Sequence, residues 1–181
     1  MMKIYLETDR MILREFTSAD VDNLTLLDAD PEVTRYINGG KPTPRSYIVE
    51  KVMPHILVYY KNDDNQGIWA AINKPDHAFM GWFHLRPNRA DKNETELGYR
   101  FRREYWGNGF ATEGSKALLA KGFNELNVKL IVAIADPLNI GSRRVMEKIG
   151  LRYELEYAEP DGFVVVKYKL DCKSYSLLQD R

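Results

Sequence analysis

The order of apolar and polar residues predicts one strand and three helices in the first third of the chain. Residues 3–16 are rich in Ile, Leu, Met and Phe interrupted by charges, which is typical of a strand. Residues 17–28 then place apolar side chains at helical spacing behind a Thr or Ser cap. Two more helices are predicted at Asp30 and Thr43, because a Pro follows each of these capping residues. Pro54 is expected to kink the last of them.

The rest of the chain predicts a group of strands and then an alternation of strands and helices. Three strand-like runs are separated by turn-rich segments, as in an antiparallel meander, and cover residues 67–73, 78–86 and 95–103. From Gly109 the apolar period becomes that of a helix, and a buried-strand pattern and a second helix follow. Residues 151–170 predict two strands joined by a hairpin at Asp161 and Gly162. No repeat or linker divides the chain, so we expect one domain over residues 1–181.

Composition and charge narrow the functional classes. The 181 residues include 26 basic and 26 acidic side chains, so no overall field attracts nucleic acid or an anionic membrane. Cys172 is the only cysteine, which excludes a disulfide framework and a cysteine-rich metal site and fits a reducing cytoplasm. Even the longest apolar runs, such as residues 130–135, are short. The sequence therefore predicts neither a signal peptide nor a membrane span. We therefore expect a cytoplasmic protein with no metal, no nucleic-acid partner and no membrane partner.

The clearest chemical signal is the stretch EYWGNGFATEG, residues 104–114, which holds Gly107 and Gly109 between a predicted strand and a predicted helix. A glycine costs conformational entropy, so two of them around a single Asn indicate that a ligand comes close to the backbone. The unpaired amides and the dipole at a helix start favour an anion, usually phosphate. The dinucleotide fingerprint G-x-G-x-x-G is a weaker alternative, because Thr112 stands at its third glycine and the stretch lies in mid-chain.

Several segments in a fixed order carry a resemblance to a known family. They are ELGYRFRREY, WGNGFATEG and VKLIVAIADPLNIGSRRVMEKIGLRYE, which together resemble the acetyl-CoA-binding core of the GNAT N-acetyltransferases, here about residues 94–151. Residues 7–37 resemble the RimJ/RimL-like branch, which acetylates ribosomal proteins, and the whole resemblance extends to about residue 170. Gly109 and Ala111 match the family's loop, whereas Trp106 stands where Gln or Arg is usual, a departure that this branch shares.

The resemblance implies a fold and an activity. The fold is a single α/β domain around a central mixed, mostly antiparallel seven-stranded sheet, with helices on both faces. Its parallel pair, residues 99–103 and 130–135, is splayed to admit the cofactor. The activity is direct transfer of an acetyl group from acetyl-CoA, the co-substrate, to a primary amine in a ternary complex without a metal. In this branch the amine is often a protein N-terminus, other members use small molecules, and the resemblance is compatible with a homodimer.

The resemblance also implies which residues bind the cofactor. The backbone amides of residues 107–112 should hold the CoA pyrophosphate, and the backbone of Phe101–Arg103 should pair with the pantetheine arm. Asn139 and Ser142 lie along this arm in the family, with Ser142 near the sulfur as the candidate proton donor. Helix statistics alone would make Asn139 an N-cap and Ser142 a first-turn residue. The predicted cofactor-binding residues are Phe101, Arg102, Arg103, Gly107, Asn108, Gly109, Phe110, Ala111, Thr112, Asn139 and Ser142.

The carboxylates near the loop are candidates for the base that accepts a proton from the amine. Glu94 and Glu96 share one face of the strand that leads into it, and Glu96, the nearer one, is the candidate base or water-positioning residue. In the alternative interpretation both carboxylates are solvated or paired with Arg100 and Arg102 on the same face. The predicted catalytic residues are Ser142, Glu96 and Asn139.

The acceptor side is the least defined part of the prediction. Tyr36 belongs to the region that shapes the acceptor groove in the resembled family, and Trp82 lies on a predicted strand, so both are candidates for substrate binding. Two rival functions stay open. A non-catalytic acyl-CoA-binding or sensory module would bind CoA without turnover, and a dinucleotide-binding oxidoreductase would bind a nicotinamide or flavin cofactor instead.

Overall fold

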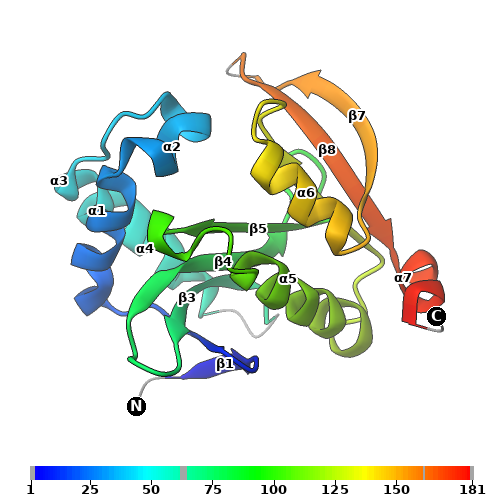
Figure 1. Ribbon diagram of the computed structural model, residues 1–181, viewed down its shortest axis with the longest axis horizontal. Helices are drawn as coiled ribbons and strands as arrows, with labels where there is room; N and C mark the ends of the chain where they lie inside the picture. The colour runs from blue at the N-terminus through cyan, green and yellow to red at the C-terminus, as the bar shows by residue number, and fades with distance from the viewer. Residues whose placement is uncertain (1–2, 62–64, 161, 180–181) are drawn as a thin grey trace. The chain divides into compact units, whose positions relative to one another are not determined.

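The computed structural model of the protein describes residues 3–61, 65–160 and 162–179, and it has a single-domain α/β fold built on one mixed sheet (Figure 1). The eight strands are hydrogen-bonded in the order β1-β2-β3-β4-β5-β6-β8-β7. The strands are β1 (Ile4–Glu7), β2 (Met11–Arg14), β3 (Gly67–Asn73), β4 (Phe79–Pro87), β5 (Thr95–Phe101), β6 (Leu130–Ala135), β7 (Arg152–Ala158) and β8 (Val164–Asp171). The predicted fold class is confirmed, with one strand more than the seven expected.

The additional strand arises at the start of the chain. Residues 3–16 were expected to form one strand, but they form the antiparallel pair β1 and β2. The turn between them is closed by two hydrogen bonds, in which Thr8 N donates to Met11 O at 2.9 Å and Met11 N donates to Thr8 Oγ1 at 3.0 Å. The polar residues at this turn look, in the sequence, like the charged residues that interrupt the apolar pattern elsewhere in the segment. The pattern alone therefore does not indicate that the chain reverses direction here.

Two compact units can be distinguished within the fold. The first consists of Met1–His84 and Tyr99–Gly114, and the second of Leu85–Gly98 and Ser115–Arg181. Strands β4 and β5 and helix α5 (Phe110–Ala120) each contribute residues to both units. Each unit has its own helices, α1 to α4 in the first unit and α6 and α7 in the second.

The first unit contains helices α1 to α4, which pack on β3 and β4. They are α1 (Val21–Ala29), α2 (Pro31–Asn38), α3 (Arg45–Tyr47) and α4 (Met53–Tyr59). The predicted helix start at Asp30 is confirmed, since its Oδ1 accepts a hydrogen bond from Glu32 N at 2.9 Å and Pro31 occupies the first helical position. The buried core of this unit comprises Phe16, Val21, Leu24, Leu27, Val33, Ile48, Met53, Ile56, Ala70, Ile72 and Phe79.

A π-helical segment stands in place of the kink that was predicted at Pro54. Helix α3 continues into a π-helical segment, Ile48–Val52, which leads directly into α4, and Pro54 lies in the first turn of α4. Proline lacks an N–H and its ring collides with the carbonyl four residues earlier in a regular α-helix. The wider π-helical turn accommodates the ring, so the helical path continues through the proline.

The second unit combines β6, β7 and β8 with helices α6 (Ile140–Lys148) and α7 (Cys172–Gln179). The start of β5 pairs in parallel with β6 through Thr95–Ile131 and Glu96–Val132, which confirms the predicted parallel pair. Strands β7 and β8 are antiparallel and form a long ribbon that ends in α7 (Figure 1). The predicted hairpin between them is confirmed by the bond from Gly162 N to Glu159 O at 2.8 Å, although Asp161 lies outside the described residues.

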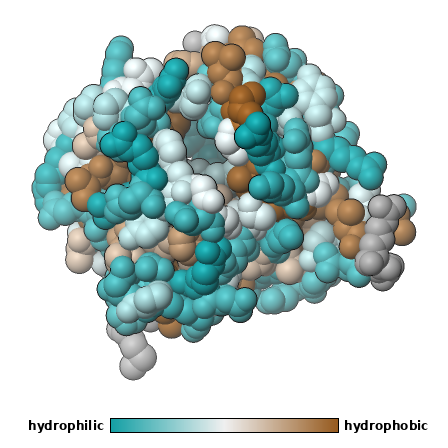
Figure 2. Space-filling view, in the orientation of Figure 1, coloured by the Kyte–Doolittle hydropathy of each residue, from teal (hydrophilic) through white to brown (hydrophobic). Residues whose placement is uncertain are grey.

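The surface shows no extended apolar area on the face in Figure 2, where hydrophilic residues predominate and apolar residues form separate small patches. Among the residues that the structure describes, no helix is long and apolar enough to span a bilayer. The same residues include no group of three or more His, Cys, Asp or Glu side chains that could hold a metal ion.

Candidate functional site

The glycine loop begins directly after β5 and belongs to the first unit. A 3-10 turn, Arg103–Tyr105, leads into it, and Gly107 and Gly109 adopt φ values of +75° and +82°. A Cβ atom on Gly107 would meet no other atom within 4 Å, and one on Gly109 would meet only Arg10 Nη2 at 3.6 Å. The glycines are therefore required by the backbone conformation and not by crowding, since the left-handed region disfavours every other residue type.

Helix α5 starts at the end of this loop. Glu113 N donates to Gly109 O at 3.0 Å, which makes Gly109 the residue that closes the first helical turn. The N–H groups of Phe110, Ala111 and Thr112 precede that bond and have no acceptor within the helix. Together with the helix dipole they form a candidate anion site. The space beside both Cβ positions is open apart from the Arg10 side chain, and the binding of the CoA pyrophosphate by the loop amides stays a prediction.

Trp106, the departure from the usual loop sequence, attaches the loop to the preceding strand. Its indole Nε1 donates a hydrogen bond of 2.8 Å to the carbonyl oxygen of Phe101, while 47% of the residue stays exposed. Asn108 Nδ2 donates in turn to Trp106 O at 3.1 Å. Trp106 thus holds the loop through a hydrogen bond to the backbone more than through burial.

The backbone of Phe101–Arg103 is only partly available for a ligand. Arg102 N donates to Met80 O on β4 at 2.8 Å, and the Phe101 carbonyl is occupied by Trp106. The predicted pairing with the pantetheine arm therefore depends on the N–H groups of Phe101 and Arg103, and Arg103 begins the 3-10 turn that follows β5.

The two acceptor-side candidates also lie in the first unit, and each is held by an arginine. Trp82 on β4 stacks on His84 with ring centroids 5.6 Å apart, and the Arg100 guanidinium lies 5.1 Å from the centre of the Trp82 ring. Arg100 Nη1 in turn donates to Asp28 Oδ1 of α1 at 2.5 Å. Tyr36 marks a local departure from helical geometry inside α2, and the Arg35 guanidinium lies 5.3 Å from its ring centre.

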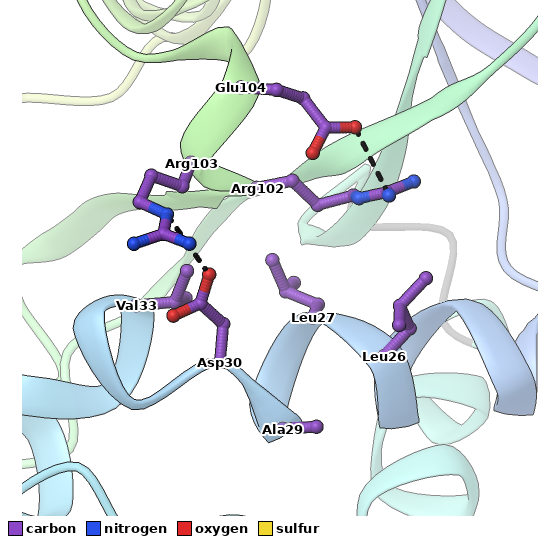
Figure 3. Close-up of a pocket in the computed structure, with 8 residues that line it drawn as sticks. All are labelled: Leu26, Leu27, Ala29, Asp30, Val33, Arg102, Arg103 and Glu104. Carbon is purple, nitrogen blue, oxygen red and sulfur yellow. Dashed lines mark ion pairs between the residues drawn. The ribbon is translucent and has the colours of Figure 1, made fainter.

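A pocket of about 280 Å³ in the first unit was not predicted from the sequence (Figure 3). Its apolar residues come from α1 and α2, Asp30 lies between these two helices, and its other charged residues follow β5. Two ion pairs lie at its edge, Arg103 Nε to Asp30 Oδ2 at 3.4 Å and Arg102 Nη2 to Glu104 Oε1 at 3.1 Å. The lining residues are Leu26, Leu27, Ala29, Asp30, Val33, Arg102, Arg103 and Glu104. The sequence singled out Asp30 as a helix start and Arg102 and Arg103 as cofactor-binding residues, but it did not indicate that they meet at one pocket.

Glu94 and Glu96 lie in the second unit and are both buried in ion pairs. Glu96 is 7% exposed and both of its carboxylate oxygens are 3.4–3.5 Å from Arg86 Nη2, on the neighbouring strand β4. Glu94 is 8% exposed and accepts from Lys167 Nζ at 2.6 Å and from Asn88 Nδ2 at 2.7 Å. The alternative of solvated carboxylates is therefore wrong.

The predicted partners of these carboxylates are corrected as well. Arg100 pairs with Asp28 and Arg102 pairs with Glu104, instead of with the two glutamates. The alternation of side chains along one strand placed all four residues on one face, but Arg100 pairs with a residue of α1 and Arg102 with a residue two positions further along the chain. Single-strand spacing cannot identify such a partner.

Asn139 and Ser142 open helix α6, also in the second unit. Asn139 is the N-cap residue, and its Oδ1 accepts a hydrogen bond from Ser142 N at 3.1 Å. The capping role that helix statistics favoured is thus confirmed for Asn139. Of the predicted residues, the first unit holds the glycine loop, Phe101–Arg103, Tyr36 and Trp82, and the second unit holds Glu96, Asn139 and Ser142.

Known proteins resemble this chain over most of its length. Residues 10–152 match the family model described as "Acetyltransferase (GNAT) domain". The chain therefore belongs to the GNAT acetyltransferase family and is an acyltransferase. A Bacillus subtilis (strain 168) relative, "Uncharacterized protein YkkB", is 36% identical over 83% of this chain and 87% of its own length. "Uncharacterized N-acetyltransferase YnaD" from the same organism is 30% identical over 83% of this chain and 84% of its own length.

Solved structures show the same fold. A GNAT-family acetyltransferase from Bacillus anthracis superimposes with a TM-score of 0.76 at 24% identity, over 96% of this chain and 99% of that one. A RimL ribosomal L7/L12 alpha-N-protein acetyltransferase in complex with CoA gives a TM-score of 0.75 at 15% identity, over 95% and 99%. At this level of identity the likeness shows the fold alone.

Proposed function

We propose that the protein transfers an acetyl group from acetyl-CoA to a protein N-terminal α-amine, by direct transfer in a ternary complex. The observation that carries the proposal is the loop in which Gly107 and Gly109 adopt positive φ and lead into the open start of α5. Family membership makes the protein an acyltransferase. The identity of the donor and of the acceptor is our inference.

Donor binding in this proposal depends mainly on the backbone. The amides of residues 107–112 hold the diphosphate, and the N–H groups of Phe101 and Arg103 pair with the pantetheine arm. Acetyl-CoA supplies the activated thioester. Hydrogen bonds to charged groups contribute about 1.5–3 kcal/mol each, so several of them give micromolar affinity after the cost of association.

The choice of an α-amine follows from the base that the structure offers. At pH 7 about one α-amine in seven is neutral, against about one lysine side chain in 2,500, a difference of roughly 3.5 kcal/mol. The Glu96 carboxylate is held in an ion pair with the Arg86 guanidinium, which lies 3.4 Å away. A carboxylate that is engaged in this way suits an amine that is already partly neutral. On this argument the acceptor is an α-amine, with Tyr36, Trp82 and the pocket at Asp30 as its contacts.

A single assay separates this function from its rivals. Thiol release from acetyl-CoA is measured over N-terminal peptides, peptides with a blocked N-terminus and an internal lysine, and small-molecule amines, beside calorimetric binding of CoA and NAD. We expect CoA binding and thiol release with free N-terminal peptides. CoA binding without turnover would instead indicate a sensory module, turnover with small amines alone would indicate a small-molecule acetyltransferase, and binding of NAD without CoA would contradict the proposal.

Replacement of Ser142 tests the proposed proton donor. We expect Ser142→Ala to lower the rate of acetyl transfer at least tenfold, because a general acid contributes roughly 10²–10⁴-fold. The affinity for CoA should change little, because the proposed contact acts on the departing thiolate. Ser176→Ala removes a serine from α7 in the same unit and should leave the rate unchanged. An unaltered rate in Ser142→Ala would remove this residue from the mechanism.

Glu96 is tested against its neighbour on the same strand. We expect Glu96→Gln to lower the rate about tenfold and to shift the acidic limb of the pH–rate profile, because the variant cannot accept a proton. Glu94→Gln is the matched control, since Glu94 is equally buried and also bound to a cation. If both variants lose the same activity, the loss comes from a broken buried ion pair and Glu96 has no role as a base.

A further inference from the structure

Arg10, in the turn between β1 and β2, contacts the glycine loop in several ways at once. Its Nη1 donates to the carbonyl oxygen of Asn108 at 3.0 Å, and its guanidinium lies 4.2 Å from the centre of the Phe110 ring. Its Nε lies 2.6 Å from Oε2 of Glu113, and its backbone N donates to Glu113 Oε1 at 3.0 Å. One side chain thus joins the loop, the start of α5 and a residue in the first turns of α5.

Glu113 needs such a partner if the start of α5 is to bind an anion. A carboxylate near the start of a helix interacts favourably with the helix dipole and repels a second negative charge. Burial works to raise the pKa of Glu113, but hydrogen bonds from the Thr8 hydroxyl and from Arg10 outweigh burial and hold its pKa below the usual value. Glu113 is therefore ionised at neutral pH, and its charge must be cancelled before a diphosphate can bind beside it.

The remaining nitrogen of Arg10 faces the glycine side of the loop. Nη2 lies 3.6 Å from the position that a Cβ atom would take on Gly109. Among the described residues, the hydrogen bonds of this guanidinium are made by Nε and Nη1, and Nη2 makes none. The side chain is 44% exposed, so the positive charge is accessible from the space beside Gly109.

We propose that Arg10 is a positioning residue for the acetyl donor, which cancels the charge of Glu113 and fixes Asn108 so that the loop amides face the diphosphate. This inference rests on the proposed function, because it assumes that the loop binds CoA. It assigns a role in donor binding to a residue 98 positions away from Asn108 in the sequence. Neither the loop geometry nor the glycine pattern indicates that Arg10 has this role.

The test is calorimetric binding of CoA to four proteins: the wild type, Arg10→Met, Glu113→Gln and the double variant. We expect Arg10→Met to weaken CoA binding at least tenfold, because the Glu113 carboxylate is then uncompensated. Glu113→Gln should bind CoA at least as tightly as the wild type, because it removes the repelling charge and keeps an oxygen that Arg10 can donate to. The double variant should bind CoA at least threefold more tightly than Arg10→Met.

The last comparison separates charge cancellation from simple support of the loop. If Arg10 only supported the loop, removing Glu113 as well would take away a second anchor and weaken binding further. Arg45→Met is the matched control, since it deletes another exposed arginine of the first unit, whose partner is Asp22. It should bind CoA as the wild type does. Circular dichroism melting of each variant confirms that it is folded.

The outcomes distinguish the two proposals. A wild type that does not bind CoA overturns the proposed function itself. A wild type that binds CoA while Arg10→Met binds within twofold of it overturns the role of Arg10. Loss of affinity in Arg10→Met with no recovery in the double variant also overturns the inference, because Arg10 would then not act through Glu113.

Discussion

The Gly109→Val variant is expected to lose CoA binding by more than a hundredfold while the domain stays folded. Gly109 has φ = +82°, a conformation that a β-branched residue almost never adopts. The space around its Cβ position is open, with only Arg10 Nη2 at 3.6 Å, an ordinary van der Waals contact, so the Cβ of valine meets no packing obstacle. The backbone will instead change conformation, and the amides at the start of α5 will turn away from the diphosphate. Isothermal calorimetry with CoA measures the loss.

Gly162→Val provides the control for backbone strain. Gly162 has φ = +89° and nothing within 4 Å of its Cβ position, and it lies in the turn between β7 and β8 in the second unit. The substitution therefore imposes the same kind of strain at a place that the proposal does not use. We expect its CoA affinity to stay within twofold of the wild type. Retained CoA affinity in Gly109→Val would show that the loop conformation does not matter for donor binding.

Features encoded by neighbouring residues could be predicted from the sequence. The helix start at Asp30 depends on a cap and a Pro beside each other, and the β7–β8 hairpin depends on a turn that contains Gly162. The glycine loop belongs to the same class, because positive φ at Gly107 and Gly109 is a property of those residues alone. Features of this kind can be predicted because their physical cause lies within a few residues.

Features that depend on distant partners could not be predicted. Glu96 was assigned possible partners on its own strand, but its cation, Arg86, lies on the neighbouring strand. Arg10 and Glu113 are 103 residues apart, and no spacing rule connects them. The pocket at Asp30 likewise combines the ends of α1 and α2 with residues that follow β5. In each case the register of the strands and the packing of the helices decide which charged side chains lie close together. The order of residues along the chain does not indicate the register or the packing.

The split of the first segment into β1 and β2 shows a related limit. Its consequence reaches the candidate site, because the turn created by the split carries both Thr8 and Arg10 to Glu113. A single strand over residues 3–16 would have placed Arg10 in its middle. The missed reversal and the missed contact to the glycine loop are therefore one error, with one physical cause.

Of the single variants that we predict, Gly81→Ala is expected to be the most destabilised. We expect its free energy of unfolding to fall by at least about 3 kcal/mol. Gly81 lies on β4 with φ = +151°, and a Cβ atom there would stand 2.1 Å from Arg100 O and 2.7 Å from Phe101 Cα. Both atoms belong to the backbone of β5, so no side chain can move aside. The two strands must separate, and the bond from Arg102 N to Met80 O must lengthen or break.

Gly39→Ala separates this close approach from the strain of positive φ alone. Gly39 has φ = +75° at the end of α2 and nothing within 4 Å of its Cβ position, so alanine there should cost about 1 kcal/mol. Urea unfolding followed by circular dichroism compares the two variants. A loss in Gly81→Ala no greater than that in Gly39→Ala would refute the close approach of β4 and β5. A greater loss, accompanied by weaker CoA binding in the folded fraction, would show that this approach also holds Phe101–Arg103 in place for the donor.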